Sequence, residues 1–179
     1  ASGADGIFVF YPGAAAGAFI KQYDQAGLAE ELPLYSVFTV DAISLPRLQE
    51  AGFTAVLGSQ TTQEWDPTLD NEANARFVAD YKAQFGGYPS YYAAQAYDSI
   101  MLIASAVAKV GNTEDTDALR AALKEADFDS VRGEFTYGNN NIPIQNFYLR
   151  EVVEDADGVW TTKVVKTVYE NAQDNFAAE

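Results

Sequence analysis

The first 57 residues alternate short apolar runs with helical patterns, and this alternation limits the possible folds more than any other feature of the chain. Residues 6–11 read GIFVFY and residues 34–40 read LYSVFTV, two runs rich in β-branched and aromatic side chains. A third run, FTAVL, covers residues 53–57. Such runs predict strands buried on both faces, and the order β-α-β-α-β predicts an α/β fold with a mainly parallel sheet.

Three helical patterns without strands of their own follow this region. Residues 58–70, GSQTTQEWDPTLD, are polar and without period, which predicts a connecting segment. Helices are expected over residues 72–85, 90–110 and 116–126, with Ser90 and either Asp115 or Thr116 as N-caps. Since these helices have no sheet to cover, we expect the chain to be part of a larger protein.

The last part of the chain returns to strand patterns. Residues 131–137 predict a strand, and residues 144–153 and 159–169 predict two long strands. The acidic segment 154–158, EDADG, is typical of a hairpin turn between them.

Composition excludes several classes of function. The 26 acidic and 11 basic residues give a net charge of −15, which argues against nucleic acid or an anionic membrane as a partner. The chain contains no cysteine and no histidine, so thiol catalysis and Ser-His-Asp chemistry are excluded within it. We expect no enzymatic activity, no metal site and no cofactor. The amino terminus carries no signal-peptide pattern, as expected of a mature or excised chain.

Two pairs of acidic residues resemble catalytic or calcium sites, but each is better explained by local structure. Glu64 and Asp66 flank Trp65, but adjacent acids in a polar segment are far more typical of a solvated linker than of a glycosidase pair. Asp155 and Asp157 lack the later ligands of a calcium loop, so a turn is the better interpretation.

The strand ends offer better candidates for ligand binding. Residues 12–17, PGAAAG, follow the first strand without the lysine of a phosphate loop, so this turn either binds a ligand at the carboxyl edge of the sheet or simply packs closely. Asp41 ends the second strand and could accept a bond from a ligand or cap the next helix. Tyr91, Tyr92 and Tyr97 either line a cleft at a helix start or belong to the core.

Taken together, four segments resemble the type I periplasmic solute-binding proteins of ABC transporters, in the leucine/isoleucine/valine-binding family. They are Ile7–Gly27, Tyr35–Leu45 (YSVFTVDAISL), Asn71–Ile103 and Ser130–Val153. The last, SVRGEFTYGNNNIPIQNFYLREVV, is similar to the family segment in which a V-x-G-x-F-x-F strand precedes a P-I-Q-x-x-Y-L strand. The chain looks most like the branch that takes up aromatic carboxylates, and it matches roughly the carboxyl-terminal half of such a protein.

The resemblance implies a domain organisation. The family fold has two α/β lobes with Rossmann-like parallel sheets, joined by three crossings, and the ligand is enclosed between the lobes. On that pattern residues 1–57 belong to the carboxyl-terminal lobe and 58–66 form a crossing. Residues 67–128 would supply helices of the amino-terminal lobe, and 129–179 would cross back and add the final strands of the carboxyl-terminal lobe.

The resemblance also implies a binding function, partners and site residues. It implies a non-enzymatic periplasmic protein that captures an aromatic carboxylate or branched-chain amino acid for an ABC permease, closes about a hinge, and includes an amino-terminal half. A ligand-sensing regulator of the same fold and a flavodoxin-like enzyme domain are the alternatives. The positions carried over as ligand-binding are Tyr11, Gly13, Ala14, Phe38, Asp41, Gln60 and Tyr92. Gly13-Ala14-Ala15 departs from amino-acid binders, which tend to place a tyrosine there, and this leaves room for a bulkier or aromatic group.

Overall fold

The computed structural model describes residues 3–176, and its chain divides into two compact units. Unit 1 takes in the chain as far as Thr68 together with Tyr148–Lys166, and unit 2 takes in Leu69–Phe147 and the chain from Thr167 onward. The predicted ranges 1–57 and 129–179 each include terminal residues that lie outside the described part. Within that part, none of the helices combines the length and the apolar character needed to cross a membrane.

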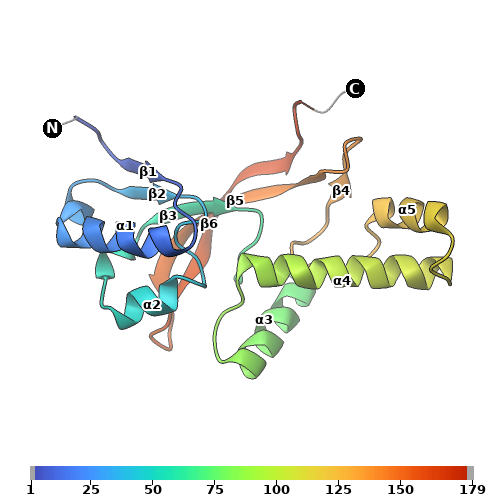
Figure 1. The fold of residues 1–179 in the computed structure, drawn as a ribbon, viewed down its shortest axis with the longest axis horizontal. Helices are drawn as coiled ribbons and strands as arrows, with labels where there is room; N and C mark the ends of the chain where they lie inside the picture. The colour runs from blue at the N-terminus through green and yellow to red at the C-terminus, as the bar shows by residue number, and fades with distance from the viewer. Residues whose placement is uncertain (1–2, 177–179) are drawn as a thin grey trace. The chain divides into compact units, whose positions relative to one another are not determined.

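Unit 1 is a mixed sheet with short helices packed on it (Figure 1). Its first elements are β1 (Ile7–Val9), α1 (Ala14–Gln25), β2 (Leu34–Ser36), α2 (Leu45–Glu50) and β3 (Gln60–Gln63). Strands β1, β2 and β3 pair in parallel, and β3 pairs antiparallel with β5 (Pro143–Glu154) through Gln60↔Glu151 to Gln63↔Tyr148. The predicted α/β class is therefore confirmed.

The hydrophobic core of unit 1 lies between α1, α2 and one face of this sheet. Its buried members come from both helices and from the strands, and they include Val9, Ile20, Leu34, Leu45, Val56, Val152 and Trp160. Gly27, which follows α1, has φ of 67° in the left-handed region, where a glycine ends a helix without strain. On the other face of the sheet, Phe8 is 74% exposed and its cross-strand partner Tyr35 is 43% exposed.

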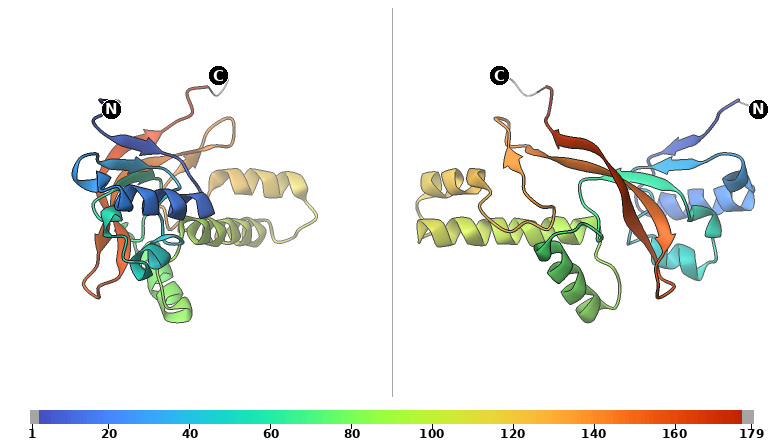
Figure 2. Two further views of the ribbon diagram at one scale, coloured as in Figure 1. Left: turned by 60° about the vertical axis from the view of Figure 1, so that its left-hand side comes forward. Right: turned by 180° about the vertical axis from the view of Figure 1, so that it is seen from behind.

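Unit 2 is built on three helices, as predicted. They are α3 (Glu72–Phe85), α4 (Tyr91–Val110) and α5 (Thr116–Glu125). The side chains of Asn71, Ser90 and Asp115 cap them by accepting from Asn74 N, Ala93 N and Ala118 N. Helix α5 runs beside α4 in every view (Figure 2), and the Phe77 ring of α3 contacts the Tyr97 ring of α4 at 4.9 Å.

The long strands contribute to both units. The first residues of β5 pair with the short β4 (Thr136–Tyr137) in unit 2, whereas its later residues pair with β3 in unit 1. Strand β6 (Trp160–Ala172) pairs with β5. The predicted strands 144–153 and 159–169 are thus confirmed; β5 is one residue longer at each end, and β6 begins one residue later and ends three residues later than predicted.

Four predictions about regular structure differ from the structure. Residues 54–56 form a short 3-10 helix that buries Val56, and the third strand is instead Gln60–Gln63, inside the segment predicted to lack regular structure. That strand is polar because its pairing is set by β2 and β5, which hold it from both sides. Strand β2 ends at Ser36 rather than at residue 40, since the backbone turns at Phe38.

The predicted strand 131–137 is reduced to Thr136–Tyr137. The preceding residues are held instead by a carboxylate, because Asp98 accepts from Ser130 Oγ at 2.6 Å and from Val131 N at 3.0 Å. Backbone groups that bond a side chain are not available to a strand ladder.

Candidate ligand-binding site

The predicted site residues of unit 1 gather, with one exception, at the carboxyl edge of β1 and β2. Tyr11, Gly13 and Ala14 follow β1, and Phe38 and Asp41 follow β2, the parallel neighbour of β1. Gln60 lies elsewhere, since it begins β3 and pairs with Tyr35 in the middle of β2. In open α/β sheets ligands bind at the carboxyl ends of strands, so this edge is the part of unit 1 best placed for a ligand.

The turn after β1 is shaped by a glycine. Gly13 has φ of 71° and ψ of −139° and serves as the N-cap of α1, whose first residue is Ala14. A side chain there would meet no heavy atom within 4 Å, so glycine is required by the backbone conformation and not by a lack of space. Both Tyr11 and Ala14 are exposed. The Tyr11 ring contacts Phe19 of α1 at 5.6 Å.

A threonine that the sequence analysis did not select joins the two strand ends. Thr39 is buried, and its Oγ1 accepts a hydrogen bond from the backbone N–H of Tyr11 at 2.9 Å. The same hydroxyl lies 3.2 Å from the carbonyl oxygen of Val37 and 3.4 Å from that of Val9, to which it can donate. The signal in the sequence was a hydroxyl residue between two apolar residues at a strand end, which is too common a pattern to stand out.

Asp41 caps the segment that leads into α2. Its Oδ1 accepts from Ile43 N at 2.9 Å and from Ser44 N at 3.0 Å, which is one of the two roles that the sequence left open. Within residues 3–176 no protein hydrogen bond engages Oδ2. The capping bonds therefore fix the carboxylate while one oxygen stays available at the edge of the sheet.

A buried cation lies under this edge. Arg150 of β5 donates through Nη2 to Gln63 Oε1 at 2.7 Å and through Nη1 to the carbonyl oxygen of Trp65 at 3.3 Å. Its Nη1 is 3.8 Å from Asp66 Oδ2. Burial lowers the pKa of Arg150, while the negative charges of Asp66, Asp41 and Glu64 act in the opposite direction. A guanidinium so placed stays charged, so it offsets the carboxylates at this end of the sheet.

Asp66 is not part of a solvated linker, and that interpretation is wrong. It is fully buried, and it accepts from Thr68 Oγ1 and Thr68 N through Oδ1 and from Thr162 Oγ1 through Oδ2 at 2.7 Å. Thr68 Oγ1 in turn accepts from Val164 N at 3.1 Å. The carboxylate therefore ties the chain after β3 to β6 and has a structural role.

Three buried polar atoms beside this network lack protein partners. Ser36 Oγ, Thr61 Oγ1 and Arg150 Nε have no hydrogen bond among the described residues. The three residues are in register across β2, β3 and β5, with Ser36 opposite Thr61 and Thr61 opposite Arg150. Buried donors and acceptors without partners cost free energy, so this row is a weak point of the unit 1 core.

Tyr92 belongs to unit 2 and lies in the first turn of α4. It is 52% exposed, and its ring stands edge-on to Tyr91 at 5.5 Å. Gln95 Nε2 donates to the Tyr91 hydroxyl at 3.1 Å. Of the three tyrosines considered in the sequence, Tyr97 is partly buried and its ring packs on Phe77. Tyr92 has the exposure that a ligand contact requires.

Hollows exist in both units, but they are lined by residues other than the predicted site residues. In unit 1 a hollow of about 570 Å³ lies among residues that include Tyr23, Pro33 and Ser59. It is at the amino ends of β2 and β3, opposite to the edge where α/β proteins bind ligands. In unit 2 a hollow of about 290 Å³ includes Asn71 and Ser130. Volume alone therefore does not identify the site. Residues 3–176 contain no cluster of side chains suited to hold a metal ion.

The chain is similar in sequence to a known family and to curated proteins. The family described as periplasmic binding protein matches residues 1–158. Leu/Ile/Val-binding protein homolog 6 of Brucella abortus is 29% identical over 184 residues, which cover 99% of this chain and 46% of that protein.

Solved structures agree with the family match. A solute-binding protein of an ABC transporter from R. palustris, in complex with benzoate, has a TM-score of 0.80 at 30% identity over 96% of this chain and 45% of its own. Another, from Rhodopseudomonas palustris HaA2 in complex with p-hydroxybenzoic acid, has a TM-score of 0.82 at 30% identity over 99% of this chain and 48% of its own. The chain thus spans less than half the length of these relatives.

Proposed function

Because the chain belongs to the periplasmic binding protein family, we propose that it is part of an extracytoplasmic solute-binding component of an ABC transporter. The complete protein captures a small organic solute in the cleft between its two lobes and delivers it to a permease, without catalysis. The observation that carries the proposal is the carboxyl edge of β1 and β2, where Tyr11 follows β1, and Phe38 and Asp41 follow its parallel neighbour β2. Mostly apolar walls with a few oriented polar groups are typical of small-molecule sites.

An aromatic carboxylate is the ligand class that these residues favour. Relatives that are 30% identical were solved with benzoate and with p-hydroxybenzoic acid. In this chain Phe10 and Phe38 supply aromatic rings at the edge, in edge-to-face contact at 6.1 Å. The turn Gly13–Ala15 carries no bulky side chain, which leaves room for a ring. A branched-chain amino acid is the second candidate, supported by the relationship to the Leu/Ile/Val-binding homolog.

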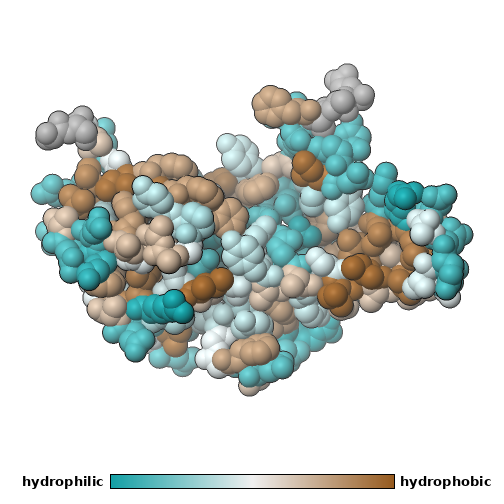
Figure 3. Space-filling view, in the orientation of Figure 1, coloured by the Kyte–Doolittle hydropathy of each residue, from teal (hydrophilic) through white to brown (hydrophobic). Residues whose placement is uncertain are grey.

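We also propose the lobe assignment that the family pattern implies. Unit 1 would form most of the carboxyl-terminal lobe, and α3, α4 and α5 would cover a sheet of the amino-terminal lobe. Exposed apolar side chains support this. On α4, Ile100 is 66% and Ile103 is 51% exposed, and hydrophobic side chains gather over α4 and α5 in the space-filling view (Figure 3). Apolar side chains in such numbers on one helix face are typical of a surface that another element covers.

Substitution of the apolar face tests this assignment. In the full natural protein, Ile100→Ser should lower the free energy of unfolding by about 2 kcal/mol or more if the side chain is buried there, because a large apolar group is lost from a core. Ile142→Ser, which removes an isoleucine 49% exposed in unit 2 outside the helices, is the matched control. If both changes stay within about 0.5 kcal/mol of wild type, as surface substitutions do, the assignment fails.

Binding measurements with two ligands test the function. We expect calorimetric titration to detect benzoate or leucine, with no turnover of either. Asp41→Asn keeps an acceptor for the capping bonds but removes the charge. It should lower the affinity for leucine about tenfold or more, because the ligand ammonium loses a charged partner. It should not lower the affinity for benzoate. Tyr92→Ala should lower the affinity for whichever of the two ligands the protein binds. Titrations of the full protein that show no heat with either ligand, or that are unchanged by both substitutions, would contradict the site assignment.

The regulatory alternative is distinguished by the remainder of the natural protein. An export signal and a neighbouring permease are expected of a transport component, whereas a fused regulatory domain would favour a ligand sensor of the same fold.

A further inference from the structure

One residue at the candidate site has a backbone conformation that its type disfavours. Phe38 has φ of 53°, in the left-handed region, which is rare for a bulky residue and costs free energy. In the part of the chain that the structure describes, the other non-glycine residues with positive φ are Ala126, Asn141 and Asn171. Asparagine tolerates this region. Ala126 is the C-cap of helix α5, and the left-handed conformation is common at the carboxyl end of a helix. Phe38 therefore stands apart.

The residues around Phe38 hold it in this conformation. On one side Val37 N donates to Val9 O at 3.1 Å. On the other side the buried Thr39 accepts from Tyr11 N at 2.9 Å. Both bonds join the β2 end to the β1 end, so the backbone on either side of Phe38 is fixed to the neighbouring strand. A strained residue persists when its surroundings determine it in this way, and such residues concentrate at ligand sites.

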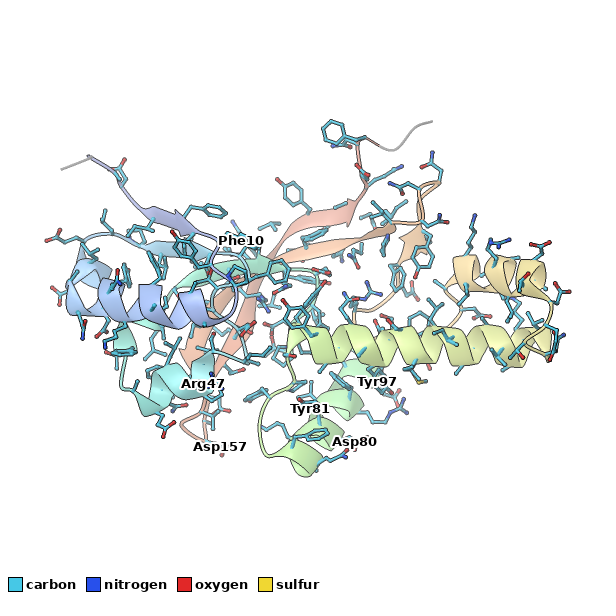
Figure 4. The ribbon with its side chains drawn as sticks, viewed as in Figure 1. Phe10, Arg47, Asp80, Tyr81, Tyr97 and Asp157 are labelled. Atoms are coloured by element: carbon cyan, nitrogen blue, oxygen red, sulfur yellow. The ribbon has the colours of Figure 1, made fainter. Side chains whose placement is uncertain are left out.

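The conformation places the Phe38 ring against Phe10. The two ring centroids are 6.1 Å apart with an interplanar angle of 82°, the edge-to-face arrangement that aromatic pairs prefer. Phe10 follows the last residue of β1 (Figure 4) and is 57% exposed, and Phe38 is half-buried. Two rings fixed beforehand can contact a flat ligand ring without a further loss of conformational entropy on binding.

We propose that Phe10 and Phe38 form a preorganised aromatic wall that selects a ligand with a flat aromatic ring, and that Thr39 is the positioning residue that maintains it. The inference rests on the proposed function and makes it more specific. Neither Phe10 nor Thr39 was among the predicted site residues. The strain at Phe38 is the cost in stability of holding the ring where it can meet a ligand.

The strain is tested by melting without ligand. Phe38→Ala and Phe38→Gly both remove the ring, but only glycine is unstrained at positive φ. In the full natural protein, Phe38→Gly should therefore melt roughly 2 °C or more above Phe38→Ala, the reverse of the usual order for these two residues. Ala126→Gly is the matched control, because it also relieves a positive φ but lies in unit 2 at the end of α5. It should raise the melting temperature and leave affinity unchanged.

The wall is tested by calorimetric titration with benzoate and with leucine. Phe38→Ala and Phe10→Leu should each lower the affinity for benzoate about three- to tenfold, the range measured for aromatic pairs. Both substitutions should change the affinity for leucine much less. Thr39→Val should lower the affinity for benzoate, because it removes the hydroxyl that joins the two strand ends. Thr39→Ser keeps a hydroxyl and should keep the affinity close to wild type. A purely steric role of Thr39 would not produce this difference.

Each outcome decides a separate question. Phe38→Gly melting below Phe38→Ala would overturn the claim of strain, and unchanged benzoate affinity in Phe38→Ala and Phe10→Leu would overturn the wall. A wild-type protein that binds leucine and not benzoate would leave the solute-binding function standing but would overturn the wall. Binding of neither ligand would refute the proposed function for these two ligand classes and the wall with it, while the melting comparison would still decide the strain.

Discussion

Arg132 Nε donates to Asp98 Oδ2 at 2.9 Å, and both side chains are almost fully buried. The pair joins α4 to the loop that precedes β4, and Arg132 Nη1 extends it to Gln145 Oε1 of β5 at 2.8 Å. Asp98 also accepts from Ser130 Oγ and Val131 N, so the carboxylate is satisfied on both oxygens. A single acidic residue on a helix thus fixes a loop more than thirty residues later in the chain.

We predict that Asp98→Ala lowers the free energy of unfolding by about 3–5 kcal/mol, because it leaves the guanidinium of Arg132 buried without its partner. Urea unfolding monitored by circular dichroism measures the change. Asp117→Ala breaks the exposed pair with Arg120, 2.7 Å apart, and should cost less than about 1 kcal/mol. If both substitutions lower the free energy of unfolding by the same amount, the buried pair contributes no more to stability than the exposed one.

A threonine in the row of unpartnered atoms gives a prediction of opposite sign. Thr61 Oγ1 is buried without a hydrogen bond, so Thr61→Val removes a desolvated hydroxyl at nearly constant volume. We expect the free energy of unfolding to rise by about 1 kcal/mol. Chemical denaturation of the full protein measures this. A loss of stability would instead indicate that an ordered water satisfies the hydroxyl.

The same replacement at Thr162 should be destabilising. Thr162 Oγ1 donates to Asp66 Oδ2 at 2.7 Å in a buried setting. Thr162→Val should lower the free energy of unfolding by about 1.5–3 kcal/mol, since a hydrogen bond to a charged group is lost. The pair of threonine-to-valine substitutions therefore separates hydrogen bonding from shape. A Thr162→Val protein that is as stable as wild type, or more stable, would contradict the assignment of Asp66 as a structural carboxylate.

Tyr23 makes stability depend on alkaline pH. It is buried, its hydroxyl donates to Leu32 O at 2.7 Å, and burial raises the pKa of Tyr23 above its ordinary value. The unfolded chain releases this proton near pH 10 while the folded chain retains it, so stability is lost as the pH rises above about 10. Tyr23→Phe should cost about 1 kcal/mol at pH 8, and the difference from wild type should shrink towards pH 11.

The measurement is urea unfolding at several pH values between these limits. Tyr169→Phe serves as the control for loss of an exposed tyrosine hydroxyl, and it should change the free energy of unfolding by less than about 0.5 kcal/mol. A Tyr23→Phe difference from wild type that does not vary with pH would show that the buried hydroxyl does not contribute to the alkaline transition.

The sequence was most informative where a local pattern has a single solution. The helices α4 and α5 begin at predicted caps because Ser90 and Asp115 are suited to accept from the first free N–H groups of a helix. The strand pattern after residue 143 was strong because two long runs are separated by a turn sequence.

Prediction failed where neighbours decide the structure. The polar QTTQ segment is a strand because β2 and β5 pair with it, and its own side chains give no such signal. The apolar FTAVL run looked like a strand, yet it forms a 3-10 turn that buries Val56 in the core. Asp66 looked solvated because its partners Thr162 and Arg150 lie far away in the sequence.

By itself the sequence determined the α/β class, the three helices of unit 2 and the resemblance to solute-binding proteins, because periodicity, caps and turns are local properties. Only the tertiary structure decided that Thr39 joins the ends of β1 and β2, that Phe38 is held at positive φ, and that Phe10 stands against it. These relationships depend on which strand lies beside which. Since pairing is set by the packing of the whole unit, no local pattern in the chain encodes them.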